Sequence, residues 1–263
     1  MTFNEMETNI HKALEKSRGR ASVAIEIEGN VLDIKGAEKM RAASVIKLPI
    51  LLEGYRQIDQ GKFFVNEKIA IGPRDKAGGS GVLSHLDSLE ELAFADILML
   101  MTIVSDNTAS NLAIKHIGFE AINRVCADLG CSETVLGRYF MDAEAMERGM
   151  DNTTTANDML RLLKAIDQDG VLTVESRKRV LETLKQQQFK TNLHGRIDED
   201  GDVIIYSKSG GLPSVVNDVG IFEFQGRKAY AAVLLGDLPD NHIGQEIIAE
   251  IGWLVYQFLS GQE

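Results

Sequence analysis

The sequence has only four prolines, two cysteines and one tryptophan among 263 residues, and it has no long hydrophobic run. Its longest apolar segment, "LAFADILMLMTIV", is interrupted by Asp96 and falls short of the roughly 18 residues that a membrane-spanning helix needs. We therefore interpret this segment as a buried helix and expect no membrane partner. Cys126 and Cys131 show no metal-ligand spacing, so we predict two buried free thiols.

Basic residues are also scarce, since 28 Lys and Arg face 39 Asp and Glu, for a net charge of -11. This balance argues against nucleic acid or an anionic membrane as a partner and favours a small-molecule substrate, with no obligate protein partner evident. The five histidines are scattered, so we predict no metal and no cofactor. The N-terminus lacks the pattern of a signal peptide, so the sequence as given predicts a cytoplasmic location, or secretion if a leader was trimmed.

The pattern of elements predicts an α+β fold. An amphipathic N-terminal helix precedes a hairpin, "ASVAIEIEGNVLDIKG", and residues 44–190 are mainly helical. Strands return in "DVIIYSKSG", "NDVGIFEFQ" and "KAYAAVLLGDL", before the closing helix "HIGQEIIAEIGWLVYQFL". We expect an antiparallel sheet flanked by the N- and C-terminal helices (1–47 and 190–263), an inserted all-helical subdomain (48–189), and an active site at their interface.

The segment "AASVIKLPILLEGY" places Ser44 and Lys47 three residues apart at the start of a predicted helix. This spacing puts both side chains on one face, where a neutral Lys47 amine could take the proton of the Ser44 hydroxyl. The free N–H groups of a helix start also favour developing negative charge. The structural alternative is a Lys47 that lies along the surface with its amine in water.

A second motif, Ser105-Asp106-Asn107, separates two predicted helices. Its structural interpretation is a helix break with an N-cap, which all three residue types favour. Its functional interpretation is a proton relay through Ser105 and a substrate hydrogen bond from Asn107.

A third motif, Lys208-Ser209-Gly210-Gly211, ends a predicted strand. Glycines at a strand edge let a ligand approach the backbone, and a cation beside a hydroxyl suits a carboxylate. The alternative is a hairpin turn with a solvated lysine.

Together the three motifs form the ordered set S-x-x-K, S-D-N and K-[ST]-G. With this set the chain resembles the penicillin-recognising serine hydrolases, and class A β-lactamases most of all. The segments "MRAASVIKLPILLE", "LMTIVSDNTASNLAIKHIG", "DNTTTANDMLRLL" and "VVNDVGIF" are similar to family segments in the same order, from about Ser22 onward.

The resemblance implies a role for each motif residue. Ser44 would be the nucleophile, Lys47 its proton acceptor and Ser105 the proton shuttle. Lys208 and Ser209 would bind a substrate carboxylate, and the N–H groups of Ser44 and Gly211 would form the oxyanion hole. Asn107 would contact a substrate amide, while Asp106 would cap and brace its loop.

The chain departs from the family pattern in the loop from Arg138 to Asn152, which is about one residue shorter. Where class A β-lactamases carry the glutamate that activates the deacylating water, this chain has Phe140. Glu144 is the first candidate to replace that base and Asp142 the second, although both could be solvated loop carboxylates.

Two further departures concern hydrogen bonding and substrate binding. Asn152 stands where the family has an aspartate paired with the loop arginine, so we expect a hydrogen bond from Arg138 to Asn152. The strand after Gly211 lacks the arginine that many members use for the substrate carboxylate, and Arg196 or His194 could replace it.

The resemblance predicts a serine hydrolase that opens a β-lactam or related carboxylate-bearing cyclic amide through a Ser44 acyl-enzyme. Two alternatives stay open. One is an intracellular esterase, amidase or peptidase with the same nucleophile, and the other is a penicillin-binding protein that is acylated and turns over slowly, which Phe140 favours.

Overall fold

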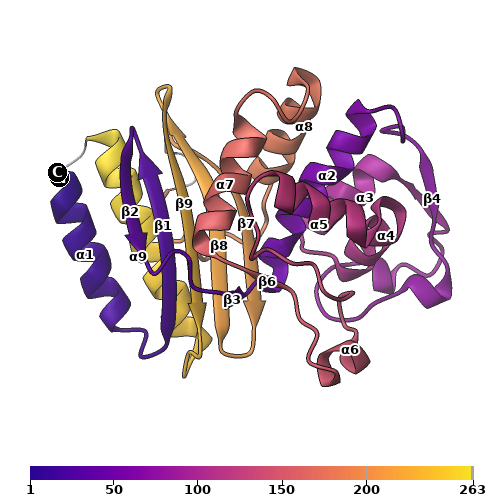
Figure 1. The fold of residues 1–263 in the computed structure, drawn as a ribbon, viewed down its shortest axis with the longest axis horizontal. Helices are drawn as coiled ribbons and strands as arrows, with labels where there is room; N and C mark the ends of the chain where they lie inside the picture. Colours follow the sequence, from indigo (N-terminus) through magenta and orange to yellow (C-terminus); the bar gives the residue numbers. More distant parts are fainter. Residues whose placement is uncertain (199–200, 262–263) are drawn as a thin grey trace.

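A computed structural model describes residues 1–198 and 201–261 of the chain, and its fold is α+β, as predicted. Its main sheet is antiparallel and has the strand order β2-β1-β9-β8-β7 (Figure 1). The strands span β1 Arg20–Ile27, β2 Asn30–Ile34, β7 Ile204–Leu212, β8 Val215–Phe224 and β9 Arg227–Gly236. The predicted N-terminal hairpin and the three C-terminal strands therefore join in one sheet.

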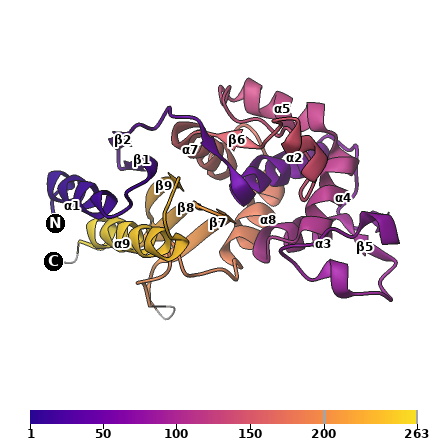
Figure 2. The same cartoon turned by 90° about the horizontal axis from the view of Figure 1, so that it is seen from below.

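Helices α1 (Phe3–Glu15) and α9 (Asn241–Ser260) cover one face of this sheet and lie side by side, so the two ends of the chain are close together (Figure 2). Helix α1 begins with a capping box, in which Thr2 accepts from the Glu5 amide and the Glu5 carboxylate accepts from the Thr2 amide. Its buried residues repeat at helical spacing (Met6, Ile10, Ala13, Leu14). The apolar face of α1 therefore completes the core under α9.

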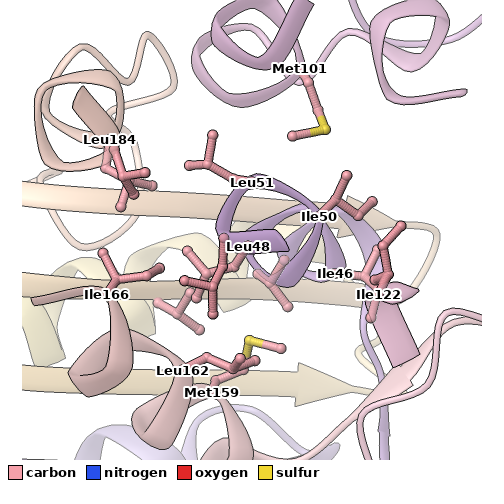
Figure 3. Packing of buried hydrophobic residues seen from close by; sticks show 14 of the residues in the cluster. Ile46, Leu48, Ile50, Leu51, Met101, Ile122, Met159, Leu162, Ile166 and Leu184 are labelled. Atoms are coloured by element: carbon pink, nitrogen blue, oxygen red, sulfur yellow. The ribbon is translucent and has the colours of Figure 1, made fainter. Parts of the chain in front are cut away.

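The opposite face of the sheet is covered by α7 (Ala156–Asp167) and α8 (Val174–Lys185). Beyond them lie α2 (Lys47–Asp59), α3 (Phe94–Ile103), α4 (Asn107–Ile117) and α5 (Phe119–Asp128). Figure 3 shows Leu48, Ile50 and Leu51 of α2 at the centre of this packing. These residues are almost fully buried, so hydrophobic burial fixes the start of α2 against the sheet.

The structure departs from the expected pattern in three places. Glu91–Ala93 is not the start of a helix but strand β5, paired with β4 (Lys68–Ala70), because the backbone pairing outweighs the local helical pattern. The loop from 138 to 152 contains a short helix, α6 (Ala143–Glu147). Ser44 lies in a single 3₁₀ turn, η1 (Ala43–Ile46), which leads directly into α2 at Lys47.

Smaller elements complete the helical part. Strands β3 (Met40–Arg41) and β6 (Thr153–Thr154) pair beside η1, and two more 3₁₀ turns are η2 (Pro73–Asp75) and η3 (Leu83–His85). Cys126 and Cys131 are buried free thiols, as predicted. Among the helices that the structure describes, none is long and apolar enough to cross a bilayer.

Candidate active site

The structure brings the first two motifs together around the amine of Lys47. The Lys47 Nζ lies 2.7 Å from the carbonyl oxygen of Ser105, 3.0 Å from the Ser105 Oγ and 3.1 Å from the Asn107 Oδ1. The Lys47 side chain is 0% exposed, which rules out the alternative of a surface lysine. Its burial leaves the amine with protein partners in place of water.

The surroundings of Lys47 favour its neutral form. Desolvation by burial lowers the pKa of this amine well below its ordinary value, and the charge of Lys208 lowers it further, while Asp106 acts in the opposite direction. A neutral amine is a base, so this environment suits proton abstraction from a neighbouring hydroxyl.

Lys208 reaches the same hydroxyl from the sheet. Its Nζ lies 3.3 Å from the Ser105 Oγ and donates to the Ser209 carbonyl oxygen at 2.7 Å. The side chain is 1% exposed, so the alternative of a solvated hairpin lysine is wrong. Burial lowers the pKa of Lys208 to about 7, with the carboxylate of Asp218 opposing this shift. The Ser105 hydroxyl is therefore held between two amines of lowered pKa.

Asp106 caps and braces its loop, as predicted. Its Oδ1 accepts from the Ala109 amide at 2.9 Å at the start of α4, and its Oδ2 accepts from the amides of Val82 at 2.6 Å and Leu83 at 2.8 Å. These bonds hold Ser105 in a left-handed backbone conformation, with φ of 54°. The strained turn directs the Ser105 side chain toward the two lysines.

Phe140 takes part in the site through both its ring and its backbone. Its ring centroid lies 4.2 Å from the Lys47 Nζ. Asn111 on α4 fixes the Phe140 backbone, accepting from its amide at 2.8 Å and donating to its carbonyl oxygen at 3.1 Å. Asn111 belongs to none of the three sequence motifs, although its spacing of four from Asn107 places both residues on one face of a helix.

Neither carboxylate proposed as a deacylating base lies in the site. The Glu144 side chain is 87% exposed, and its carboxylate lies 3.8 Å from the guanidinium of Arg148. Asp142 accepts from the Ala145 amide at 2.9 Å as the N-cap of α6. The short helix turns Glu144 toward solvent and uses Asp142 as its N-cap. Neither residue therefore lies where the sequence led us to expect a replacement for the deacylating base.

The expected hydrogen bond from Arg138 to Asn152 is present, but the backbone amide of Arg138 donates it, at 3.1 Å. The Arg138 guanidinium forms an ion pair with Asp151, at 2.9 Å from Nη2 and 3.1 Å from Nε. Arg41 contacts the other oxygen of Asp151 at 2.7 Å. The Asn152 Oδ1 accepts from the backbone amides of Gly137 and Arg138, so it braces the backbone of the loop.

The two candidate replacements for the missing arginine lie outside the pocket of the site. Arg196 lies 3.5 Å from Glu250 of α9, on the far side of the sheet. The His194 Nε2 lies 3.0 Å from the Oγ of Ser207, on β7. Neither residue lines the pocket that contains Ser44.

That pocket has a volume of about 350 Å³, with polar residues at one end and an apolar wall. Ser44, Asn107 and Gly211 lie at its polar end. The wall is formed by hydrophobic side chains of the 140–146 segment and the end of β7, namely Phe140, Met141, Met146, Leu212 and Pro213. Among the described residues, no cluster of His, Cys, Asp or Glu has the composition of a metal site.

Comparisons with known proteins agree with the fold described above. The model of the beta-lactamase enzyme family matches residues 5–259. A beta-lactamase from Sphaerobacter thermophilus DSM 20745 has 30% sequence identity and a TM-score of 0.93, with 100% of both chains covered. A mutant of PBP-A, solved as an acyl-enzyme complex with penicillin G, has 25% identity and a TM-score of 0.88, covering 98% of this chain and 97% of the other.

An ancestral class A beta-lactamase has the same fold, with 21% identity, a TM-score of 0.87, and coverage of 96% of this chain and 99% of the other. A search of curated proteins finds no match. The family match spans nearly the whole chain, and the described residues have the α+β architecture of class A β-lactamases and PBP-A. The chain therefore belongs to the beta-lactamase enzyme family.

Proposed function

We propose that this protein is a serine acyl-transfer enzyme that opens a β-lactam or related amide by acylation of Ser44, and that water releases the acyl group slowly. The observation that carries this proposal is the chain of contacts from Lys47 through Ser105 to Lys208, covered by the Phe140 ring. This chain of contacts contains the groups that acylation needs. Phe140 places an apolar side chain where a deacylating base would act.

Acylation begins at the Ser44 hydroxyl. Lys47, neutral because of its burial, takes the Ser44 proton directly or through a water molecule while the Ser44 oxygen bonds to the carbonyl carbon. The carbon–nitrogen bond of the substrate then breaks. Ser105 gives its proton to the departing nitrogen and recovers one from Lys47, so the net result is the loss of one proton by Ser44 and the gain of one by the product amine.

The negative charge of the tetrahedral intermediate needs donors close to its oxygen. In this proposal the N–H groups of Ser44 and Gly211 form the oxyanion hole, and both residues line the pocket. The position of Ser44 in the first turn before α2 adds the favourable field of a helix start.

Substrate binding uses the pocket and the part of β7 beside it, where Lys208 and Ser209 precede the lining residue Gly211. Lys208 and Ser209 receive a substrate carboxylate, and Asn107 contacts a substrate amide; the Asn107 Nδ2 is held by the Gly78 carbonyl oxygen at 3.0 Å. The apolar wall suits a hydrophobic acyl substituent, because covering Met141 and Met146 removes exposed apolar surface from water.

Slow release follows from the groups around Lys47. Phe140 presents no proton acceptor, and Glu144 faces solvent. Without a carboxylate positioned to activate water, its attack on the ester loses the contribution of about 100- to 10,000-fold that general base catalysis supplies. The acyl-enzyme would therefore outlive that of a rapid β-lactamase.

Intact-protein mass spectrometry over a time course with penicillin G tests this proposal, beside a Ser44→Ala variant and a nitrocefin hydrolysis assay. We expect an adduct with the mass of the whole penicillin that needs Ser44 and persists after free penicillin is removed. Rapid loss of the adduct with fast nitrocefin turnover would contradict slow release, and the absence of any adduct would contradict β-lactam acylation.

A further inference from the structure

One buried amide side chain connects the strands of the sheet to the turn that carries Ser44. The Asn217 side chain, on β8, is 0% exposed. Its Nδ2 donates to the carbonyl oxygens of Arg41 at 2.9 Å and Ala42 at 3.1 Å, and its Oδ1 accepts from the Leu235 amide of β9 at 3.2 Å. All three bonds run to backbone atoms, so Asn217 fixes the path of the chain just before η1.

The segment that Asn217 holds is strained. Ala43 has a φ of 47°, in the left-handed region that disfavours a residue with a Cβ. The flanking Ala42 is held on both sides, because its amide donates to the Asn152 carbonyl oxygen at 2.9 Å and its own carbonyl accepts from the Asn217 side chain. Such a conformation persists only where surrounding contacts enforce it, and Ser44 is the next residue.

The fit between this turn and the sheet is close. A Cβ built on Gly210 of β7 would lie 2.8 Å from the Ser44 amide nitrogen and 3.0 Å from that of Val45. The backbones of η1 and β7 are therefore in direct contact beside Gly211. A small shift of residues 41–43 would change the position of the Ser44 N–H relative to the N–H of Gly211.

We propose that Asn217 is a positioning residue for the oxyanion hole: it holds the strained turn so that the Ser44 and Gly211 amides point at one oxygen. This inference rests on the proposed role of Ser44 as nucleophile. Asn217 touches neither substrate nor reacting atoms, and it acts through the Arg41 and Ala42 carbonyls. A misplacement of about 1 Å by such an indirect route can reduce a rate by about 100-fold.

Two variants test this role, Asn217→Ala and the nearly isosteric Asn217→Asp, which keeps an acceptor for Leu235 but lacks the amide donors. Asn192→Ala is the matched control, because Asn192 is also buried and its Nδ2 donates to the Asn217 carbonyl oxygen at 3.5 Å rather than to the turn. Each protein is first compared by its melting temperature, so that loss of fold is measured separately.

The readout that separates positioning from general stability is the affinity for a phenylboronic acid. The Ser44 oxygen donates an electron pair to boron and its proton passes to Lys47, which leaves a tetrahedral boronate with an oxygen in the oxyanion hole. A second readout is penicillin G acylation, divided into the dissociation constant of the initial complex and the maximal rate.

We expect both Asn217 variants to lose about 10- to 100-fold in boronic acid affinity and in maximal acylation rate, with the initial dissociation constant changed less than about threefold. Asn192→Ala should keep both. Unchanged boronic acid affinity in a folded Asn217 variant, or an equal loss in Asn192→Ala, would overturn the positioning role alone. A wild-type protein that binds no boronic acid, or a Ser44→Ala variant that still binds it, would overturn the proposed nucleophile as well.

Discussion

The ring centroid of Phe140 lies 4.2 Å from the Nζ of Lys47, so an aromatic ring covers the amine that the proposed mechanism uses as a base. Asn111 fixes this arrangement through both backbone hydrogen-bonding groups of Phe140. The ring adds to the burial of Lys47, which favours the neutral form of the amine, and Phe140 itself presents no acidic group. The proposed acylation and the proposed slow deacylation therefore depend on the same pair of residues.

Phe140→Glu should accelerate deacylation, because it introduces a carboxylate on a backbone that Asn111 holds beside Lys47. We expect the acyl-enzyme to disappear at least about 10-fold faster than in the wild type, within the range that a general base supplies. The measurement is the decay of the penicillin adduct by mass spectrometry after free penicillin is removed.

Two controls accompany this variant. Phe140→Leu keeps an apolar side chain and should leave the decay slow, and Glu144→Gln should change it less than about twofold because Glu144 is exposed. Equal decay rates in Phe140→Glu and Phe140→Leu would show that the identity of this side chain does not limit deacylation.

Met146→Asn should weaken the selection of hydrophobic acyl substituents, because Met146 lines the apolar wall of the pocket. We expect acylation by penicillin G to fall about three- to tenfold relative to 6-aminopenicillanic acid, which lacks the phenylacetyl group. Met150→Asn is the matched control, since Met150 is similarly exposed but does not line the pocket. Equal effects of the two substitutions would argue against a specific contact.

The pH dependence of acylation should have two limbs for a carboxylate-bearing substrate. The rate rises with pH as Lys47 loses its proton, at a pKa well below the ordinary 10.5. Lys208 binds a carboxylate only when protonated and has a pKa of about 7, so the rate falls as pH rises past about 7. Stopped-flow acylation by penicillin G between pH 5 and 10 measures both limbs.

Lys208→Arg separates the two groups, because a guanidinium stays protonated throughout this range. We expect the variant to lose the alkaline limb and to keep the acid limb. A p-nitrophenyl ester without a carboxylate should likewise show no alkaline limb with the wild type. An alkaline limb that persists in Lys208→Arg would assign it to another group.

Asp151→Ala should destabilise the fold, because it leaves the buried Arg138 guanidinium without its ion-pair partner and frees Arg41. We expect a loss of about 1–3 kcal/mol in the free energy of unfolding, measured by urea denaturation. Glu175→Gln, which removes an exposed pair with Arg179, should cost less than about 0.5 kcal/mol. Similar costs for both variants would show that Asp151 contributes no more than a surface charge.

The sequence predicted the parts of the site that depend on local spacing. Ser44 and Lys47 lie within one turn, and Asp106 caps the helix that directly follows it, so short-range patterns were sufficient. The pattern of apolar residues likewise predicted the strands of the main sheet. Each face of this sheet packs on a hydrophobic core, so most residues of β8 and β9 are buried.

The loop from 138 to 152 was predicted less well, because its side-chain directions depend on tertiary contacts. Glu144 faces solvent because the Asp142 cap fixes where α6 begins, and with it which residues of the helix point outward. Asp151, rather than Asn152, meets the Arg138 guanidinium because adjacent residues of an extended chain point in opposite directions. Asn217 could not be identified from sequence, since its partners lie 175 and 176 residues away in the chain.

Ser44 is the proposed acylated nucleophile, and tandem mass spectrometry of the penicillin-treated protein identifies the residue that carries the acyl group. Proteolysis under denaturing conditions, followed by sequencing of the modified peptide, locates the added group on one residue. We expect the penicilloyl group on the Ser44 oxygen and its absence from Ser44→Ala. A penicilloyl group on another residue, or an equally modified Ser44→Ala protein, would contradict it.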